Sequence, residues 1–253
     1  LYLMQERLLF MPEPLAADHR FAFPGKFEEH RIAVDGAELS ALWFRAAPKA
    51  GLAGAAPKGA SGTVFYLHGN AGSLRSWGDV APTFTQRGYD VFILDYRGYG
   101  KSSGAIASEQ MLHDDVADVY AYMMQRNPAQ PIYIYGRSIG TGLAIELARQ
   151  HAPQALLLEA PYFSLSWLAR EHYPWVPAGL LRYRMASDQR LPQVRAPVHF
   201  FHGANDTTIP PNASRMLAEL VDGSKSVTIV ENAAHNDVRH TKAYNTALDR
   251  VLP

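Results

Sequence analysis

The stretch from residue 132 to residue 149 constrains the fold of this chain most. Residues 132–135 are apolar and favour a β-strand, and Gly136-Arg137-Ser138-Ile139-Gly140 follows them almost at once. Residues 143–149 then carry apolar side chains at helical spacing. A strand, a tight turn with a serine at its tip and a helix are therefore predicted in direct succession.

A Gly-x-Ser-x-Gly turn between a strand and a helix is typical of an activated serine. The glycines leave room for a sharp turn, the serine oxygen is exposed, and the N-terminal N–H groups of the helix point at the same place. Ser138 is therefore the candidate nucleophile. The alternative is an ordinary turn serine, but the flanking strand and helix favour the first interpretation.

Strand and helix patterns alternate along the rest of the chain, and Asp35-Gly36 between the first two runs predicts a hairpin. Strands are predicted at residues 27–34, 38–45, 63–67, 89–94, 155–159, 197–201 and 226–230. Helices are predicted from near Ser76 and at residues 108–126, 211–221 and 238–252. Residues 46–62 are rich in Ala, Gly, Pro and Lys and predict a loop. The pattern predicts one α/β domain over residues 1–253, with a mostly parallel central sheet and helices on both faces.

The composition narrows the classes of function. The 24 Lys and Arg residues balance the 24 Asp and Glu residues, so no basic excess indicates a nucleic-acid partner. The absence of Cys excludes a disulfide framework, a cysteine nucleophile and a thiolate metal site. Gly100-Lys101-Ser102 resembles the end of a phosphate-binding loop, but Asp95 stands where that motif needs glycine. No metal-ligand spacing is recognisable, so neither a metal nor another cofactor is expected.

Polar clusters follow four predicted strands: residues 68–72, 136–140 and 203–206, and the loop that holds His235. Because parallel strands end at one edge of a sheet, these clusters are expected to meet there. The chain order Ser138, Asp206, His235 is that of the α/β-hydrolase fold.

The motifs resemble those of the Bem46-type serine hydrolases, a branch that includes protein depalmitoylases and lysophospholipase-like enzymes. The matching segments are His68-Gly69-Asn70-Ala71-Gly72, residues 95–102, Gly136-Arg137-Ser138-Ile139-Gly140, His202-Gly203-Ala204-Asn205-Asp206 and Ala234-His235-Asn236-Asp237. Thr141 differs from the family pattern, in which glycine or another small residue is common at this position after the turn. The resemblance covers nearly the whole chain and implies a lipid-like acyl substrate, but it does not define the substrate further.

Serine chemistry assigns a role to each candidate. His235 would take the proton of Ser138, and Asp206 would hold the imidazole in the right tautomer. The backbone N–H groups of Ile139 and Asn70 are the expected oxyanion donors, with Ala71 as the alternative to Asn70.

Other roles remain open for these side chains. Asp206 could instead cap the following helix, which would make Asp95 or Asp237 the acid, and His235 could be a surface histidine. Asp95 is better explained as a residue that bonds turn N–H groups, and His68 as a support of its own turn. No catalytic role is expected for His199, His202 or His240.

The insertion at residues 162–195 predicts a short helical cap over the sheet edge. Phe163, Trp167 and Trp175 are its candidate pocket residues, because apolar side chains there could line an acyl pocket and exclude water. The alternative is that they only pack the cap onto the body.

Residues 1–12 form an apolar segment that is too short to span a bilayer. Three explanations fit it: the end of a removed membrane anchor, an amphipathic surface helix, or a strap on the domain. The first two would allow membrane association through the N-terminus. The oligomeric state is not predicted.

The sequence favours a hydrolase of carboxylic esters or thioesters that works through an acyl-Ser138 intermediate. A peptidase or C–C bond hydrolase could use the same triad. The competing class without catalysis is a receptor that binds a small apolar molecule.

Overall fold

A single twisted sheet lies at the centre of the molecule. The computed structural model describes residues 5–46, 60–175 and 181–252. Within these ranges one eight-stranded sheet has the order β10-β9-β8-β7-β4-β6-β3-β2. Its strands are β2 (Phe27–Val34), β3 (Ala37–Phe44), β4 (Thr63–Leu67), β6 (Asp90–Leu94), β7 (Ile132–Arg137), β8 (Ala155–Glu159), β9 (Val198–Gly203) and β10 (Lys225–Val230).

The strands from β10 to β6 run parallel, and the predicted hairpin β2–β3 adds the antiparallel edge. Strands β4, β6 and β8 are buried along their whole length. Such burial is expected where helices cover both faces of a parallel sheet. The parallel strands therefore end along a common edge.

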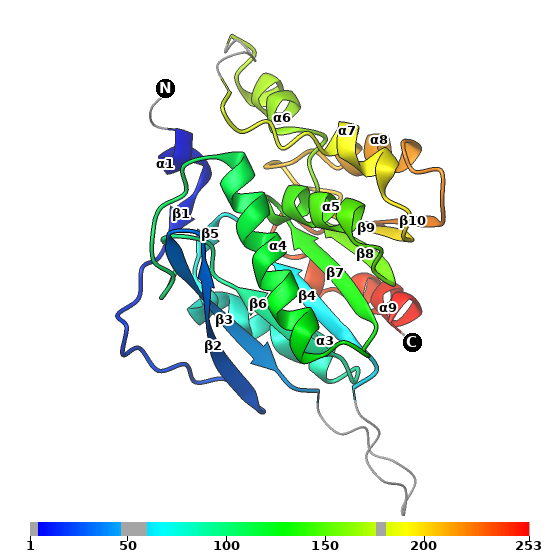
Figure 1. Cartoon of the computed structure of the whole chain (residues 1–253). Coiled ribbons are helices and arrows are strands. Elements are labelled where there is room, and N and C mark those ends of the chain that lie inside the picture. Colours follow the sequence, from blue (N-terminus) through cyan, green and yellow to red (C-terminus); the bar gives the residue numbers. More distant parts are fainter. Residues whose placement is uncertain (1–4, 47–59, 176–180, 253) are drawn as a thin grey trace, which may run out of the picture.

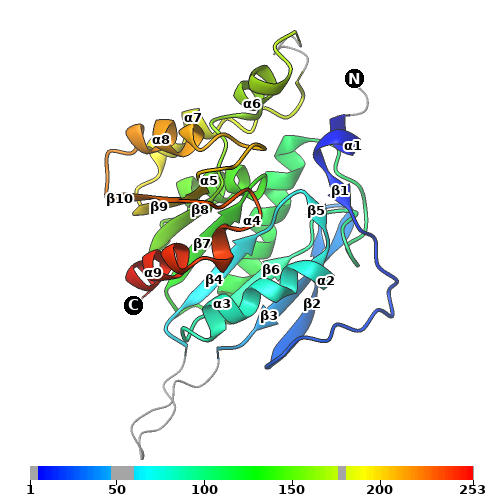
Figure 2. The ribbon, with the colours of Figure 1, turned by 180° about the vertical axis from the view of Figure 1, so that it is seen from behind.

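Helices cover the two faces of the sheet in separate layers (Figures 1 and 2). On one face, α4 (Glu109–Arg126), α5 (Gly140–Gln150) and α8 (Asn212–Glu219) share an apolar core with the sheet. On the other face, α2 (Leu74–Trp77), α3 (Ala81–Thr85) and α9 (Lys242–Val251) share a second core. The observed layers agree with the predicted α/β architecture.

Two predicted helix boundaries are wrong, and local capping explains both. Helix α2 begins at Leu74, slightly before the start predicted near Ser76, because the Ser73 side chain accepts the N–H of Arg75. The predicted helix at residues 238–252 is divided into a 3-10 turn (Val238–His240) and α9. Thr241 lies between them in an extended conformation and caps α9 by accepting the N–H of Tyr244.

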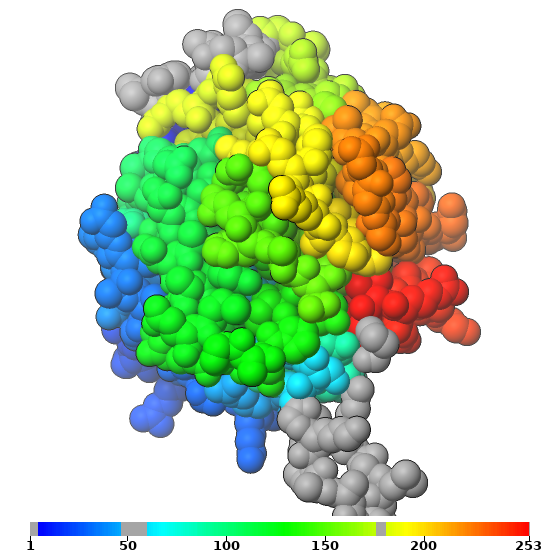
Figure 3. Space-filling view, turned by 45° about the vertical axis from the view of Figure 1, so that its right-hand side comes forward, coloured from blue at the N-terminus to red at the C-terminus, as the bar shows by residue number. Residues whose placement is uncertain are grey.

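The insertion between β8 and β9 carries α6 (Leu165–His172), α7 (Ser187–Arg190) and a 3-10 turn (Leu191–Gln193). The yellow part of the insertion lies against the green surface around α5 and the orange surface around α8 (Figure 3). At the N-terminal end, α1 (Gln5–Leu9) leads into β1 (Met11–Pro12), which pairs with β5 (Ala71–Gly72). No helix in the described ranges is long and apolar enough to cross a membrane.

Candidate active site

Ser138 lies at the tip of a strained turn between β7 and α5. Its φ is 51°, in the left-handed region that a residue with a side chain rarely adopts. The turn is packed so closely that a Cβ atom on Gly140 would lie 2.2 Å from the carbonyl oxygen of Leu67. The N–H of Ser138 donates to the carbonyl of Glu159 at 2.9 Å, and Thr141 bonds the Ser138 carbonyl through its N–H and its hydroxyl. The turn is therefore fixed by both neighbouring elements.

The structure brings the three predicted triad residues into hydrogen-bond contact. His235 Nε2 lies 3.1 Å from Ser138 Oγ, and His235 Nδ1 lies 2.6 Å from Asp206 Oδ2. Ser138 follows β7, Asp206 follows β9, and His235 follows β10. The three side chains meet because these parallel strands end at the same edge.

The two oxygens of Asp206 have different partners. Oδ1 accepts the N–H groups of Thr208 and Ile209, both at 2.9 Å, so it orders the turn before α8. Oδ2 faces His235 and also lies 3.2 Å from His202 Nε2. Burial works against the charge on Asp206, but the hydrogen bonds from His202, His235 and Ile209 outweigh burial and hold the pKa of the carboxyl well below its ordinary value. The group is therefore a carboxylate, and it both caps the turn and faces the imidazole.

Ile139 and Asn70, the residues predicted to supply the oxyanion donors, both line the cavity that contains Ser138. Ile139 precedes the first turn of α5, so its N–H is one of those that a helix start leaves without an intrahelical acceptor. The carbonyl of Asn70 accepts the N–H of Met11 at 2.8 Å and the hydroxyl of Tyr99 at 2.6 Å. These bonds hold the loop after β4, while the choice between Asn70 and Ala71 as second donor stays a prediction.

Asp95 bonds a backbone N–H group of the turn that follows β5, which is the structural role predicted for it. Its Oδ1 accepts the N–H of Leu74 at 3.0 Å, and it lies 3.6 Å from His68 Nε2. Burial raises the pKa of this carboxyl. Asp95 supports the turn and makes no described contact with His235.

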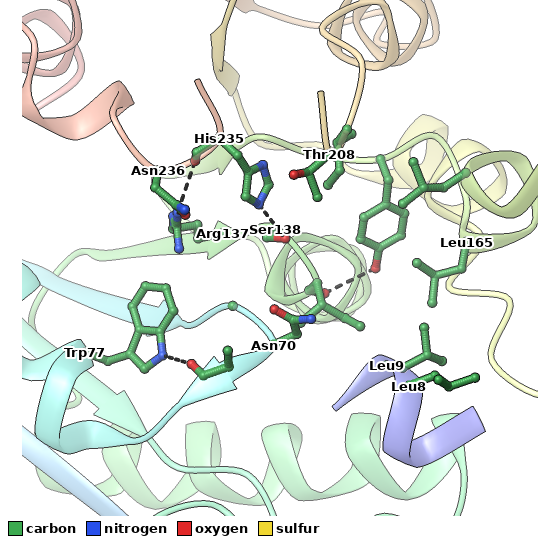
Figure 4. A pocket seen from close by; sticks show the side chains of 16 residues that line it. Leu8, Leu9, Asn70, Trp77, Arg137, Ser138, Leu165, Thr208, His235 and Asn236 are labelled. Atoms are coloured by element: carbon green, nitrogen blue, oxygen red, sulfur yellow. Dashed lines mark hydrogen bonds between the residues drawn. The ribbon is translucent and has the colours of Figure 1, made fainter. Parts of the chain in front are cut away.

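A cavity of about 390 Å³ opens over Ser138 and has two chemically different sides. One side is apolar and includes Leu8, Leu9 and Leu165. The other side includes Trp77, Arg137 and Asn236. Figure 4 shows Ser138 between them, with Leu8, Leu9 and Leu165 to its right and Trp77, Arg137 and Asn236 to its left.

The three predicted pocket residues do not line this cavity, and this part of the prediction is wrong. The side chain of Ser164 caps α6 by accepting the N–H of Trp167, which fixes the helix so that Leu165 and Leu168 line the cavity. Trp167 and Phe163 instead pack against the core, with their ring centroids 6.3 Å apart. Trp175 follows α6 and is 75% exposed. The apolar wall predicted for the cap exists, but leucines form it.

Sequence reasoning missed several other lining residues. Leu8 and Leu9 belong to α1, far from the site in sequence. The pairing of β1 with β5 and the hydrogen bond from the N–H of Arg182 to Gln5 hold that segment at the cavity. Arg137 was identified only as the variable residue of the serine motif. A charged residue at the end of an otherwise apolar strand was an available signal, because such a charge needs a buried partner.

Comparison with known proteins agrees with this architecture. A family model described as serine aminopeptidase, S33, matches residues 58–185, about half of the chain. This chain belongs to that family. It is therefore a member of the α/β-hydrolase superfamily, as the motifs predicted.

Two curated relatives of the chain share about a third of the aligned residues with it. An uncharacterised protein of Mycobacterium tuberculosis is 33% identical over 182 residues, which cover 71% of this chain and 64% of that protein. A lysophosphatidylserine lipase of Danio rerio is 33% identical over 187 residues, which cover 65% of this chain and 48% of the lipase. The chain thus spans between about half and two thirds of the length of these relatives.

Solved structures confirm the fold of this family member. An esterase of Pyrococcus furiosus superposes with a TM-score of 0.73 and 17% identity, covering 96% of this chain and 97% of the esterase. An α/β serine hydrolase without a lid from Xanthomonas campestris has a TM-score of 0.67 and 17% identity, covering 92% of this chain and 96% of that protein. The chain order Ser138, Asp206, His235 and the motifs around these residues had predicted this α/β-hydrolase fold.

Proposed function

We propose that this protein hydrolyses carboxylic esters or thioesters of lipid-like acyl chains through a Ser138–His235–Asp206 triad. The observation that carries the proposal is the chain of hydrogen bonds from Ser138 through His235 to Asp206 at the floor of a half-apolar cavity. The names of the lipase and esterase relatives support the same class of reaction.

Each step of the reaction uses a contact of the site. Ser138 Oγ bonds to the substrate carbonyl carbon while its proton passes to His235 Nε2. The carbonyl oxygen becomes an oxyanion next to the N–H groups of Ile139 and of Asn70 or Ala71. The bond to the leaving group then breaks, and the leaving oxygen or sulfur takes the proton from Nε2. A water molecule then attacks the carbonyl carbon of acyl-Ser138 while its proton passes to His235 Nε2. The bond to Ser138 Oγ breaks, Oγ takes that proton back, and the acid is released.

The apolar side of the cavity is the proposed acyl site. Leu9 of α1 and Leu165 of α6 lie on this side of Ser138 (Figure 4), and Leu168 of α6 also lines the cavity. Burying a methylene group there is worth about 0.8 kcal/mol, so longer acyl chains gain affinity until the space is full. The cavity volume of about 390 Å³ suits a small-molecule ligand.

A peptidase is the second candidate, because the family description names an aminopeptidase. An aminopeptidase needs a carboxylate for the substrate ammonium group. Among the described residues that line the cavity, none is Asp or Glu. The lining therefore favours an acyl substrate over a free peptide amino terminus.

The decisive experiment compares p-nitrophenyl esters and acyl thioesters from two to sixteen carbons, about the range of natural acyl chains, with the wild type and Ser138→Ala. We expect turnover that rises with chain length and falls by about 10⁶ in kcat when Ser138 is replaced. An alanyl anilide serves as the peptidase substrate. If only the anilide is hydrolysed, the protein is a peptidase and the proposed ester hydrolysis is wrong. If Ser138→Ala keeps wild-type turnover, the proposed triad is wrong.

A further inference from the structure

Arg137, the residue before the nucleophile, occupies an unusual position at the end of β7. Strand register places it directly opposite Glu159 of β8, and Arg137 Nε donates to Glu159 Oε1 at 3.1 Å. Both residues are buried, with relative exposures of 8% and 1%. Glu159 also accepts the hydroxyl of Tyr135 through Oε2 at 2.7 Å. The guanidinium is therefore held rigidly by the sheet.

The other end of the guanidinium reaches the loop that carries His235. Nη2 of Arg137 donates to the carbonyl oxygen of His235 at 3.1 Å and to Asn236 Oδ1 at 2.6 Å. The plane of the group lies near the ring of Trp77, with the guanidinium carbon 4.9 Å from the ring centroid. Figure 4 shows Arg137 and Asn236 next to each other on the polar side of the cavity.

In the described part of the chain, two hydrogen bonds between Ala234 and Asp237 flank His235, and Arg137 bonds the carbonyl of His235 itself. The preceding loop is tied to the sheet by Asn205, whose N–H donates to the carbonyl of Ala233 at 2.9 Å. Beyond that point, the imidazole contacts Asp206 and Ser138 through its ring nitrogens. Arg137 holds the main chain of His235 itself, so it restricts the position from which the imidazole approaches Ser138.

Glu159 connects this restraint to the nucleophile. Its backbone carbonyl accepts the N–H of Ser138 at 2.9 Å, and its side chain holds Arg137. One residue of β8 thus supports the serine turn and, through Arg137, the histidine loop. Burial opposes the charge on Arg137, but Glu159 outweighs it and raises the pKa of the guanidinium, so the group stays cationic.

We propose that Arg137 is a positioning residue that clamps the His235 loop to β8 and thereby sets the distance between His235 Nε2 and Ser138 Oγ. This inference rests on the proposed hydrolase function. Since a shift of about 1 Å in a reacting group costs up to 10²-fold in rate, the clamp acts on kcat. It leaves KM unchanged, because acyl binding uses the opposite side of the cavity.

Three variants test the clamp at increasing strength. Asn236→Ala removes one contact of Arg137 and leaves its ion pair intact, so kcat falls about tenfold, as for the loss of one charged hydrogen bond. Arg137→Lys keeps the charge but not the forked geometry, and gives partial activity. The double variant Arg137→Gln/Glu159→Gln removes both buried charges together and lowers kcat by about 10². Glu231→Ala, at an exposed position in the same loop, is the matched control and keeps wild-type kcat.

A readout independent of turnover separates this inference from the proposed function. In the proton NMR spectrum, the proton between His235 Nδ1 and Asp206 gives a downfield resonance, which broadens in Asn236→Ala and not in Glu231→Ala. Unchanged kcat and an unchanged resonance in all three Arg137 and Asn236 variants would overturn the clamp. A loss of kcat no larger than the fraction of each variant that is unfolded would overturn it as well. If the wild type lacks Ser138-dependent turnover while the resonance still responds, the proposed function fails and the clamp stands.

Discussion

The polar and apolar sides of the cavity are built from different kinds of segment. Ser138, Arg137 and Asp206 lie at or just after strand ends, and each is less than a tenth exposed. Leu8, Leu9 and Leu165 come from short helices outside the sheet, and their exposure varies widely, from 8% for Leu165 to 58% for Leu8. The groups proposed for chemistry are thus held by the sheet, while the acyl wall is added by segments outside the sheet.

This difference predicts that changes on the polar side affect every substrate equally. Asp206→Asn should lower kcat by about 10⁴ for all acyl lengths, because the amide would favour the wrong imidazole tautomer. Steady-state kinetics on one short and one long ester measure the effect. Asp237→Asn is the control, since Asp237 bonds the N–H of Ala234 and not the imidazole. A larger loss in Asp237→Asn would identify Asp237 as the acid.

Changes on the apolar side should instead depend on acyl length. Leu9→Trp fills the space of about three methylene groups and should lower kcat/KM for long-chain esters about 50-fold, while acetyl esters keep wild-type rates. Val227→Trp, on a partly exposed residue of β10, is the matched control. An equal loss for short and long esters would place Leu9 on the chemical side and contradict the two-sided cavity.

The smallest effect on turnover is expected at Glu109, which anchors the apolar side from α4. Its Oε2 accepts the N–H groups of Arg184 and Met185 at 2.8 and 2.9 Å. The same stretch of the insertion also holds α1, because the N–H of Arg182 donates to Oε1 of Gln5. Burial opposes the charge of Glu109, but hydrogen bonds from His113, Met185 and Arg190 lower its pKa to about 2.

A lowered pKa gives a stabilisation that is present above the unfolded value and disappears as the pH falls through the folded value. Glu109→Gln should therefore reduce the free energy of unfolding by roughly 3 kcal/mol at pH 7, with wild-type kcat for acetyl esters. The difference from the wild type should shrink between about pH 4.5 and about pH 2. Urea titrations at several pH values measure it, and a constant difference would show that the carboxylate charge is not the cause.

The sequence predicted the parallel strands and the hairpin, because these depend on local patterns. It also predicted that Ser138, Asp206 and His235 meet, because each follows a strand that ends at the common edge of the sheet. It placed the start of α2 slightly too late and predicted one helix where a 3-10 turn and α9 are observed, because the side chains of Ser73 and Thr241 cap the helices that follow them. The apolar wall was correctly assigned to the insertion, but its aromatic residues were chosen as the pocket residues, because hydrophobicity alone does not show which helix face points inward.

The sequence by itself therefore determined the fold class and the residues that meet at the sheet edge. Hydrogen bonding between neighbouring parallel strands aligns their ends, so a residue directly after such a strand is predicted to lie at the common edge of the sheet. Only the tertiary structure decided that α1 lines the cavity and that Arg137 connects Glu159 to the His235 loop. Both depend on contacts between segments distant in sequence, where packing and charge pairing, not local preference, select the partner.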